Sequence, residues 1–171
     1  MKNLLITSAL TAAFAAPAWA NDSTIDQIGS DNVATVTQSL GTGSSSNVLQ
    51  TGDDDIATVD QSETAPGGVG TNVSTVKQLG GWGVQTATVD QNYDGTGAAN
   101  VASILQDATE GGNTGSITQN GDANDAAIQQ GPGDVDFFNA PLGIRDNSAS
   151  IAQDGSGNFA TTNQIVGSDG G

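Results

Sequence analysis

The chain has 171 residues, and its composition excludes several classes of protein. It carries 19 acidic and three basic residues, a formal net charge of −16, which argues against nucleic acid or an anionic membrane as a partner. It contains neither Cys nor His, so it has no disulfide framework and lacks the commonest general base and metal ligand. Aromatic residues make up only 4%, and such a composition by itself indicates disorder.

The first 20 residues have the pattern of a secretory signal peptide. Lys2 supplies a positive start, residues 4–16 are largely apolar, and residues 18–20 read Ala-Trp-Ala, a small-x-small cleavage site. The apolar run is too short to span a membrane, and no other stretch of the chain could. We therefore expect a secreted protein whose mature chain begins at Asn21. All the acidic residues lie in that part, with Lys77 and Arg145 as its basic residues.

A seven-residue repeat organises residues 21–164. Read backwards from a glutamine, the unit is Asn-x-Ala-x-Val-x-Gln, as in the copy from Asn32 to Gln38. There are 11 copies, and they use 11 of the 13 glutamines. Internal repetition of this kind decides the architecture. The amide positions that we expect to stack are Gln27, Asn32, Gln38, Gln50, Gln61, Asn72, Gln78, Gln91, Asn100, Gln106, Asn113, Gln119, Asn124, Gln130, Asn147, Gln153, Asn158 and Gln164.

Every second residue of the unit is specified, which is the period of a β-strand. The position two before the glutamine is Val or Ile in ten copies, and β-branched residues favour strands. Outward positions are mostly Thr, Ser and Asp, which indicates a solvated face. The predicted apolar core is Ile25, Val36, Val48, Val59, Val76, Val89, Ile104, Ile117, Ile128 and Ile151.

One such strand cannot bury its inward face, because two of its four inward side chains are amides. In an in-register stack, each apolar row covers its neighbour and each amide bonds to the amides above and below. We therefore predict an all-β fold, a two-sheet parallel β-solenoid of 11 short strands in strand–arch–strand rungs, with cross-β structure on assembly. Odd copies form one sheet of six strands and even copies another of five. Four-residue connections containing Gly, as after Gln27 and Gln153, suit the arches.

Three segments depart from the repeat. Residues 62–71 and 92–99 are predicted to be loops rich in glycine. Residues 131–146 form a longer predicted loop, since Pro132 and Pro141 rule out a regular element; its Phe137 and Phe138 either fold back on the solenoid or contact a partner. Residues 165–171 are expected to be a flexible tail.

The repeat resembles that of the curlin family, the subunits of curli, which are functional amyloid fibres of bacterial biofilm. The resemblance rests on Asn-x5-Gln-x4-Asn-x5-Gln with Gly two residues after the first glutamine, as in residues 21–38, 113–130 and 147–164, and covers about residues 21–164. It implies export through the inner membrane of a Gram-negative-type bacterium, secretion through a dedicated outer-membrane pore, and assembly with a nucleator into surface fibres for adhesion and biofilm matrix. Nucleator-like members tend to carry basic residues in their last repeats. With Lys77 and Arg145 alone, this chain is more similar to the major subunit.

Two other classes of function remain open. The repeat also fits a monomeric β-solenoid surface protein, such as an adhesin module or an ice-binding protein with outward Thr rows, although Asn47 and Ala127 interrupt one row. An enzyme is the weaker alternative, because the acidic run of residues 53–55 has no accompanying base or nucleophile motif. We expect no catalytic site, no metal site, no cofactor and no nucleic-acid partner. Asp55 and Gly115 are expected to slow self-assembly as gatekeepers.

Overall fold

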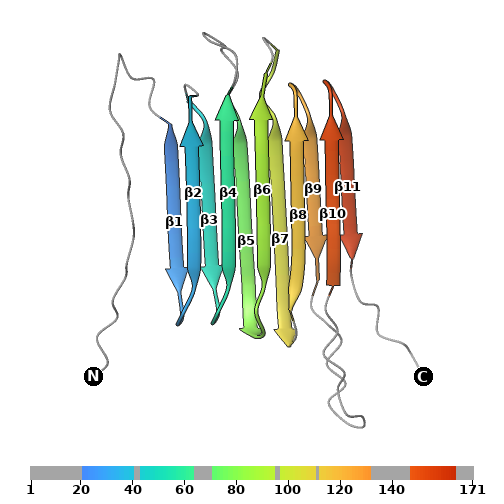
Figure 1. The fold of residues 1–171 in the computed structure, drawn as a ribbon. Helices are drawn as coiled ribbons and strands as arrows, with labels where there is room; N and C mark the ends of the chain where they lie inside the picture. Colours follow the sequence, from blue (N-terminus) through green and yellow to red (C-terminus); the bar gives the residue numbers. More distant parts are fainter. Residues whose placement is uncertain are drawn as a thin grey trace, which may run out of the picture.

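The structure, a computed structural model, describes residues 21–40, 43–63, 71–94, 97–110, 112–131 and 147–164. This part of the chain contains strands and no helix (Figure 1). The expected signal peptide, residues 132–146 of the long loop and the tail after Gln164 lie outside it. The strands are β1 (Asp22–Ile28), β2 (Val33–Ser39), β3 (Ser45–Thr51), β4 (Ile56–Glu63), β5 (Val73–Trp82), β6 (Thr86–Tyr93), β7 (Val101–Glu110), β8 (Asn113–Asn120), β9 (Asp125–Gln130), β10 (Asn147–Asp154) and β11 (Phe159–Gln164).

The strands form two parallel sheets, as the repeat predicts. One sheet has six strands in the order β1-β3-β5-β7-β9-β11, and the other has five in the order β10-β8-β6-β4-β2. Successive strands point in opposite directions and belong to different sheets (Figure 1). Two successive strands and the arch between them therefore make one rung of a solenoid, and the prediction of the fold class is confirmed.

The register of both sheets follows the repeat. Gln27 pairs with Gln50, and Val48 pairs with Val76, so equivalent positions of the unit lie side by side. The same holds across the long loop, where Ile151 of β10 pairs with Ile117 of β8. A shift of one residue would turn every inward side chain to the solvent. The inward pattern of each copy thus fixes the pairing even where the connections differ in length.

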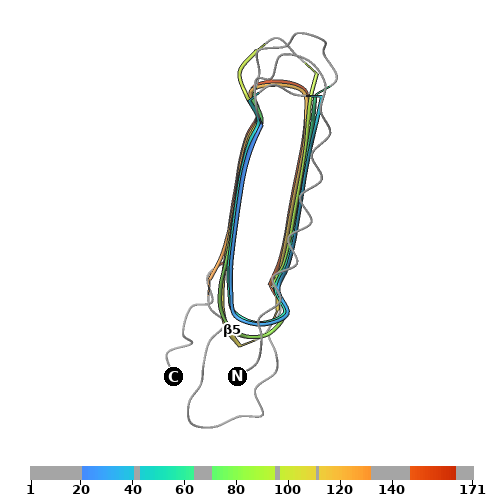
Figure 2. The same ribbon diagram turned by 90° about the vertical axis from the view of Figure 1, so that its left-hand side faces the viewer.

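Figure 2 views the rungs along the stacking direction, where they superpose as one flattened loop with an arch at each end. The four-residue arches share one backbone shape, with positive φ at their second and fourth residues. Gly29 and Asp31 have φ of 124° and 58°, and Gly155 and Gly157 have φ of 94° and 72°. Stacked arches also lie close together, since a Cβ on Gly29 would clash with the carbonyl of Gly52. Glycine is therefore required at Gly29, Gly52 and Gly121 on both grounds, and at Gly155 by its positive φ.

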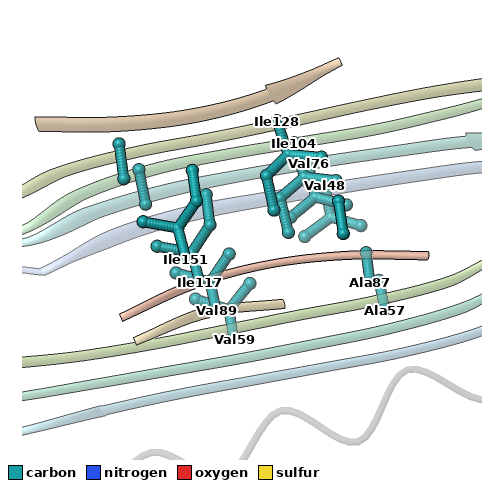
Figure 3. Close-up of a cluster of buried hydrophobic side chains, with 13 residues drawn as sticks. Val48, Ala57, Val59, Val76, Ala87, Val89, Ile104, Ile117, Ile128 and Ile151 are labelled. Carbon is teal, nitrogen blue, oxygen red and sulfur yellow. The ribbon is translucent and has the colours of Figure 1, made fainter. Parts of the chain in front are cut away.

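The core lies between the two sheets and consists of the predicted Val and Ile rows with their small neighbours. Figure 3 shows Val48, Val76, Ile104 and Ile128 from one sheet beside Val59, Val89, Ile117 and Ile151 from the other. All of these are at most 7% exposed. Ile25 is the exception to the predicted core, with 43% exposed, because β1 is at the edge of its sheet. Val36 of β2, at the neighbouring edge, is partly buried and packs against the core.

Several strands are longer than the seven-residue unit. β5 and β7 each have ten residues and remain paired to Trp82 and Glu110. β4 and β6 extend to Glu63 and Tyr93, so the predicted loops at 62–71 and 92–99 begin later than expected. Tyr93 is fully buried, and its hydroxyl donates to the carbonyl of Gly97 at 2.9 Å. Burial raises the pKa of Tyr93, and the carboxylates of Asp122, Glu63 and Asp94 add to this shift.

Two adjacent residues of β7 test the inward assignment. Ile104 is fully buried in the core, whereas Leu105 points outward and is half-buried. Ile104→Ala leaves a cavity and is expected to lower the free energy of unfolding by about 3 kcal/mol. Leu105→Ala is expected to lower it by less than about 1 kcal/mol. The urea midpoints of the two variants measure the difference, and equal losses would contradict the assignment of the faces.

Candidate assembly interface

The closing glutamines form two continuous ladders, one in each sheet. In each step the side-chain Nε2 donates to the Oε1 of the glutamine on the next strand of the sheet, at 2.7–3.0 Å. Buried amides left unpaired are costly, and the ladder pairs them. The ladder of the larger sheet contains Gln27, Gln50, Gln78, Gln106, Gln130 and Gln164, and that of the smaller contains Gln38, Gln61, Gln91, Gln119 and Gln153.

Each Nε2 has a second hydrogen, and this one joins the two sheets. It donates to the backbone carbonyl of the second residue of the preceding repeat copy, as from Gln119 to Val101 at 2.9 Å and from Gln164 to Ser148 at 2.9 Å. Ten of the 11 glutamines make this bond, at 2.9–3.2 Å. If the side-chain amide were turned by 180°, its Oε1 rather than its Nε2 would face this carbonyl oxygen, and two acceptors would repel each other. The contact therefore fixes the direction of the whole ladder, with every donor pointing toward the C-terminal edge.

The asparagines at the opening position do not form the amide-to-amide ladder that the sequence suggested. In Asn21, Asn32, Asn100 and Asn124 the Oδ1 instead accepts from the backbone N–H of the next opening residue of the same sheet, as from Asn158 to Asn124 at 3.1 Å. The Oδ1 of Asn72 has no hydrogen-bond partner in the part of the chain that the structure describes. The Nδ2 of Asn32, Asn100, Asn124 and Asn158 donates to an arch carbonyl, as from Asn32 to Gly52 at 2.9 Å. Side-chain contacts between asparagines are confined, among the described residues, to Asn147 with Asn113 and Asn158 with Asn124. Asn is one methylene shorter than Gln, so it reaches the backbone of the arch.

Asn21 and Ser44 take part in the same corner arrangement, although neither stands among the predicted stacking residues. The Oδ1 of Asn21 accepts from the N–H groups of Gly43 and Ser44 at 3.1 and 3.0 Å. The hydroxyl of Ser44 accepts from the N–H of Asn72 at 3.3 Å. Their place at the opening position of the unit is the signal that identifies them.

Asp55 occupies an opening position where most copies have Asn. It is buried, with Oδ1 accepting from the N–H of Gln85 at 3.2 Å and Oδ2 without a hydrogen-bond partner. Burial raises the pKa of Asp55; the hydrogen bonds from Gln85 oppose this shift, and the charges of Asp53 and Asp54 reinforce it. Asp53 is exposed, and its hydrogen bonds from the hydroxyl and the N–H of Ser30 lower its pKa.

The outward rows of the two sheets carry mixed chemistry. The central row of the smaller sheet is Thr35, Thr58, Thr88, Ser116 and Ser150. In the larger sheet the equivalent row contains Asn47 and Ala127. Asp60 lies beside Asp90, whose pKa is raised by burial and by the charge of Asp60. These outer faces therefore combine hydroxyl rows with like charges held side by side.

Both ends of the stack are sheet edges. Among the described strands, β1 and β2 at the N-terminal end each pair on one side only, and so do β10 and β11 at the C-terminal end. Ile25, Val33 and Phe159 are exposed there, by 43%, 52% and 72%. Unpaired edges with exposed apolar side chains are templates for a further strand. The closing glutamines are thus brought together along the described solenoid, and the glutamines of its end strands have no further glutamine among the described residues to bond.

Among the described residues, no group of three or more His, Cys, Asp or Glu side chains could hold a metal ion. The same residues contain no helix that could cross a membrane. Comparison of the chain with protein-family models, with curated proteins and with solved structures gives no match. The stacked amides and the open edges are therefore the features from which a function must be argued.

The cost of breaking a ladder can be measured within β8. Gln119→Ala removes three hydrogen bonds: the one that Gln119 accepts from the Nε2 of Gln91, and the two that it donates to the Oε1 of Gln153 and to the carbonyl of Val101. We expect a loss of about 3 kcal/mol in the free energy of unfolding. Gln129→Ala is the matched control, because Gln129 is exposed on the outer face, and it should change the urea midpoint little. A similar midpoint for both variants would show that the ladder contributes no stability.

Replacing the buried carboxylate is expected to stabilise the chain in a pH-dependent way. A raised pKa means that the folded state resists the charged form, so the unfavourable contribution of Asp55 is present at neutral pH and disappears on acidification below about pH 4. Asp55→Asn should raise the free energy of unfolding at pH 7 by about 1 kcal/mol. That gain should shrink as the pH falls. Asp54→Asn, at an exposed neighbour, serves as the control for chemical unfolding at pH 7 and pH 4.

Proposed function

We propose that this chain is a secreted structural subunit that polymerises through its sheet edges into curli-like amyloid fibres on the bacterial surface. Its role is that of a scaffold for adhesion and biofilm matrix, with no turnover of substrate. The observation that carries the proposal is the pair of open edges at opposite ends of a regular in-register stack. Such edges add strands of the same pattern, and a second copy of the chain supplies that pattern.

The direction of the ladders supports growth from end to end. Donors point toward the C-terminal edge along both sheets. Within the described part of the chain, the C-terminal edge therefore has unused Nε2 hydrogens, on Gln153 and Gln164, and the N-terminal edge has unused Oε1 atoms, on Gln27 and Gln38. Head-to-tail contact brings donors to acceptors, whereas contact between like ends brings acceptor to acceptor or donor to donor.

The net charge of −16 makes chains repel one another at low ionic strength. Association therefore depends on short-ranged contacts, and the stacked amides and apolar rows are contacts of that kind. The curlin-like repeat adds the remaining expectations: removal of residues 1–20, passage through an outer-membrane curli-type pore, and initiation by a nucleator subunit. In this proposal the fibre is a homopolymer, and the chain is the major subunit.

A monomeric surface solenoid is the second candidate. The hydroxyl row of the smaller sheet, Thr35 to Ser150, is the observation in its favour, because regularly spaced hydroxyls on a flat sheet suit an ice-binding face. The rows on either side are mixed, with Val33 and Ile56 in one and Asp60 and Asp90 in the other. The polymer is the better supported reading, since the hydroxyl row leaves the open edges unexplained.

The purified mature chain should form thioflavin-positive fibres with a reflection near 4.7–4.8 Å. Gln27→Ala or Gln164→Ala removes a ladder amide from one edge and should slow seeded growth several-fold. Thr35→Ala changes only an exposed outward residue and should leave the growth rate near that of the parent. Thermal hysteresis in place of fibres would favour the ice-binding candidate. Equal growth rates for all three variants would contradict the role of the ladder.

A further inference from the structure

The number of strands places a constraint on how two copies can join. The 11 strands of the described residues make five complete rungs and a half, so the larger sheet ends at β11 while the smaller ends one strand earlier, at β10. At the N-terminal end, β1 and β2 complete one rung. The two ends of the molecule are therefore not flush with each other.

A second copy placed by simple translation does not fit this outline. Its β1 would lie beside β11, and its β2 would face a gap two strand spacings wide, about 9.6 Å, next to β10. The missing strand would leave an unfilled space in the core and an interrupted ladder between Gln153 and the next Gln38. Voids and unpaired amides in the core are both costly.

We infer that each copy in the fibre is turned by 180° about the fibre axis relative to the copy before it. This inference rests on the proposed polymerisation and specifies its geometry. The rotation exchanges the two sheets and reverses the strand directions. β1 of the next copy then pairs with β10, and β2 of the next copy pairs with β11. The solenoid continues strand by strand, and the larger sheet of one copy is continuous with the smaller sheet of the next.

The bonding capacity of the glutamines fits this arrangement. Each of the other ten glutamines donates to a carbonyl on the preceding strand, but no described strand precedes β1, and Gln27 lacks such a partner among the described residues. In the rotated stack, the preceding strand is β11 of the neighbour, and the same rule assigns Gln27 to the carbonyl of Phe159. Gln153 and Gln164 meanwhile donate to the Oε1 of Gln27 and Gln38 of the next copy.

The arches fit as well. Rotation places the β1–β2 arch of the next copy on the β10–β11 arch. Both have four residues with Gly second and Ser third, and both have positive φ at the second and fourth residues. Within the chain, the second residue of each four-residue arch donates its N–H to the carbonyl of the first residue of the arch stacked before it. Examples are Gly52 to Ile28 at 2.9 Å and Gly155 to Asn120 at 3.1 Å. The N–H of Gly29 in the next copy then donates to the carbonyl of Asp154.

The exposed apolar side chains of the two edges also meet. Phe159 and Val33 both stand at the first outward position of their strands, and they are 72% and 52% exposed. Rotation sets Phe159 beside Val33 of the next copy and extends the row to Ile56, whereas translation sets Phe159 beside Asp22. Ile28 then lies beside Asp154, a pairing like that of Leu79 with Asp107 within the chain.

Engineered disulfides distinguish the two arrangements, because the chain contains no Cys of its own. Rotation places Thr161 directly beside Thr35 of the next copy, and translation places it beside Thr24. All three are exposed outward residues at the same position of the unit. In-register neighbours are about 4.8 Å apart, which suits a disulfide. Within one copy, Thr161 lies at the opposite end of the stack from both of the others, so any bond joins two copies.

The experiment uses two double variants, Thr35→Cys with Thr161→Cys and Thr24→Cys with Thr161→Cys, assembled under reducing conditions and then oxidised. We expect covalent chains of many subunits on a non-reducing gel from the first variant and not from the second. The reverse result, or fibres in which neither variant cross-links, overturns the rotation while leaving the proposed function intact. If the parent chain forms no fibres at all, the proposed function fails, and the rotation with it.

Helical reconstruction of unmodified fibres gives an independent readout. The rotated stack predicts a symmetry step near 180° with a rise of five and a half rungs, about 26 Å. A step near 0° with a rise of about 29 Å, as for six full rungs, would overturn the inference. Neither outcome depends on the engineered cysteines.

Discussion

The hydrogen bonding of buried amides is the constraint on which the rest of this structure depends. Each rung places two glutamine side chains inside the molecule, where an unpaired amide would be strongly destabilising. The amide of Gln119 is satisfied in three directions, by Gln91 and Gln153 along the sheet and by Val101 across the core. This pairing requires equivalent residues to lie in register. The same bonds therefore fix the pairing of strands, the separation of the sheets and the direction of the stack.

This constraint also explains how much of the fold could be read from the sequence. Strict alternation with one specified face predicts strands, and the alternation of copies between two sheets follows from the short arches, such as the one between Gln27 and Asn32. The corner chemistry could not be predicted, because Asn and Gln are chemically alike and differ in reach. Asn124 contacts the backbone of its arch, whereas Gln130 reaches the next amide. Some strands, such as those that end at Trp82 and Tyr93, continue past the closing glutamine of their copy. Where they end depends on the conformation of the connection that follows, and the repeat does not encode that conformation.

The sequence predicted which residues form the candidate interface, but not how exposed their side chains are. A repeat gives every copy the same inward pattern, so Ile25 is predicted to be buried as Val48 is. The structure leaves Ile25 43% exposed because β1 is the edge strand of its sheet among the described residues. The difference between a core position and an interface position is therefore set by location in the stack alone. For a chain of this kind, residues of an assembly interface are those that match the core in chemistry and differ from it in burial.

The first and last copies of the repeat nevertheless differ from the others at some positions. These differences make the two ends of the stack less prone to bind other strands than an edge with the sequence of a central copy would be. β11 has Thr162 where the other copies have Val or Ile, so the inward face of this edge strand presents less apolar surface. β1 carries Asp22 and Asp26 on its outward face, and charges on an edge strand oppose indiscriminate pairing. The directional amides remain intact at both ends. An edge with fewer apolar inward side chains and charged outward ones, but with specific donors and acceptors, discourages unrelated strands and still accepts a copy that arrives in register.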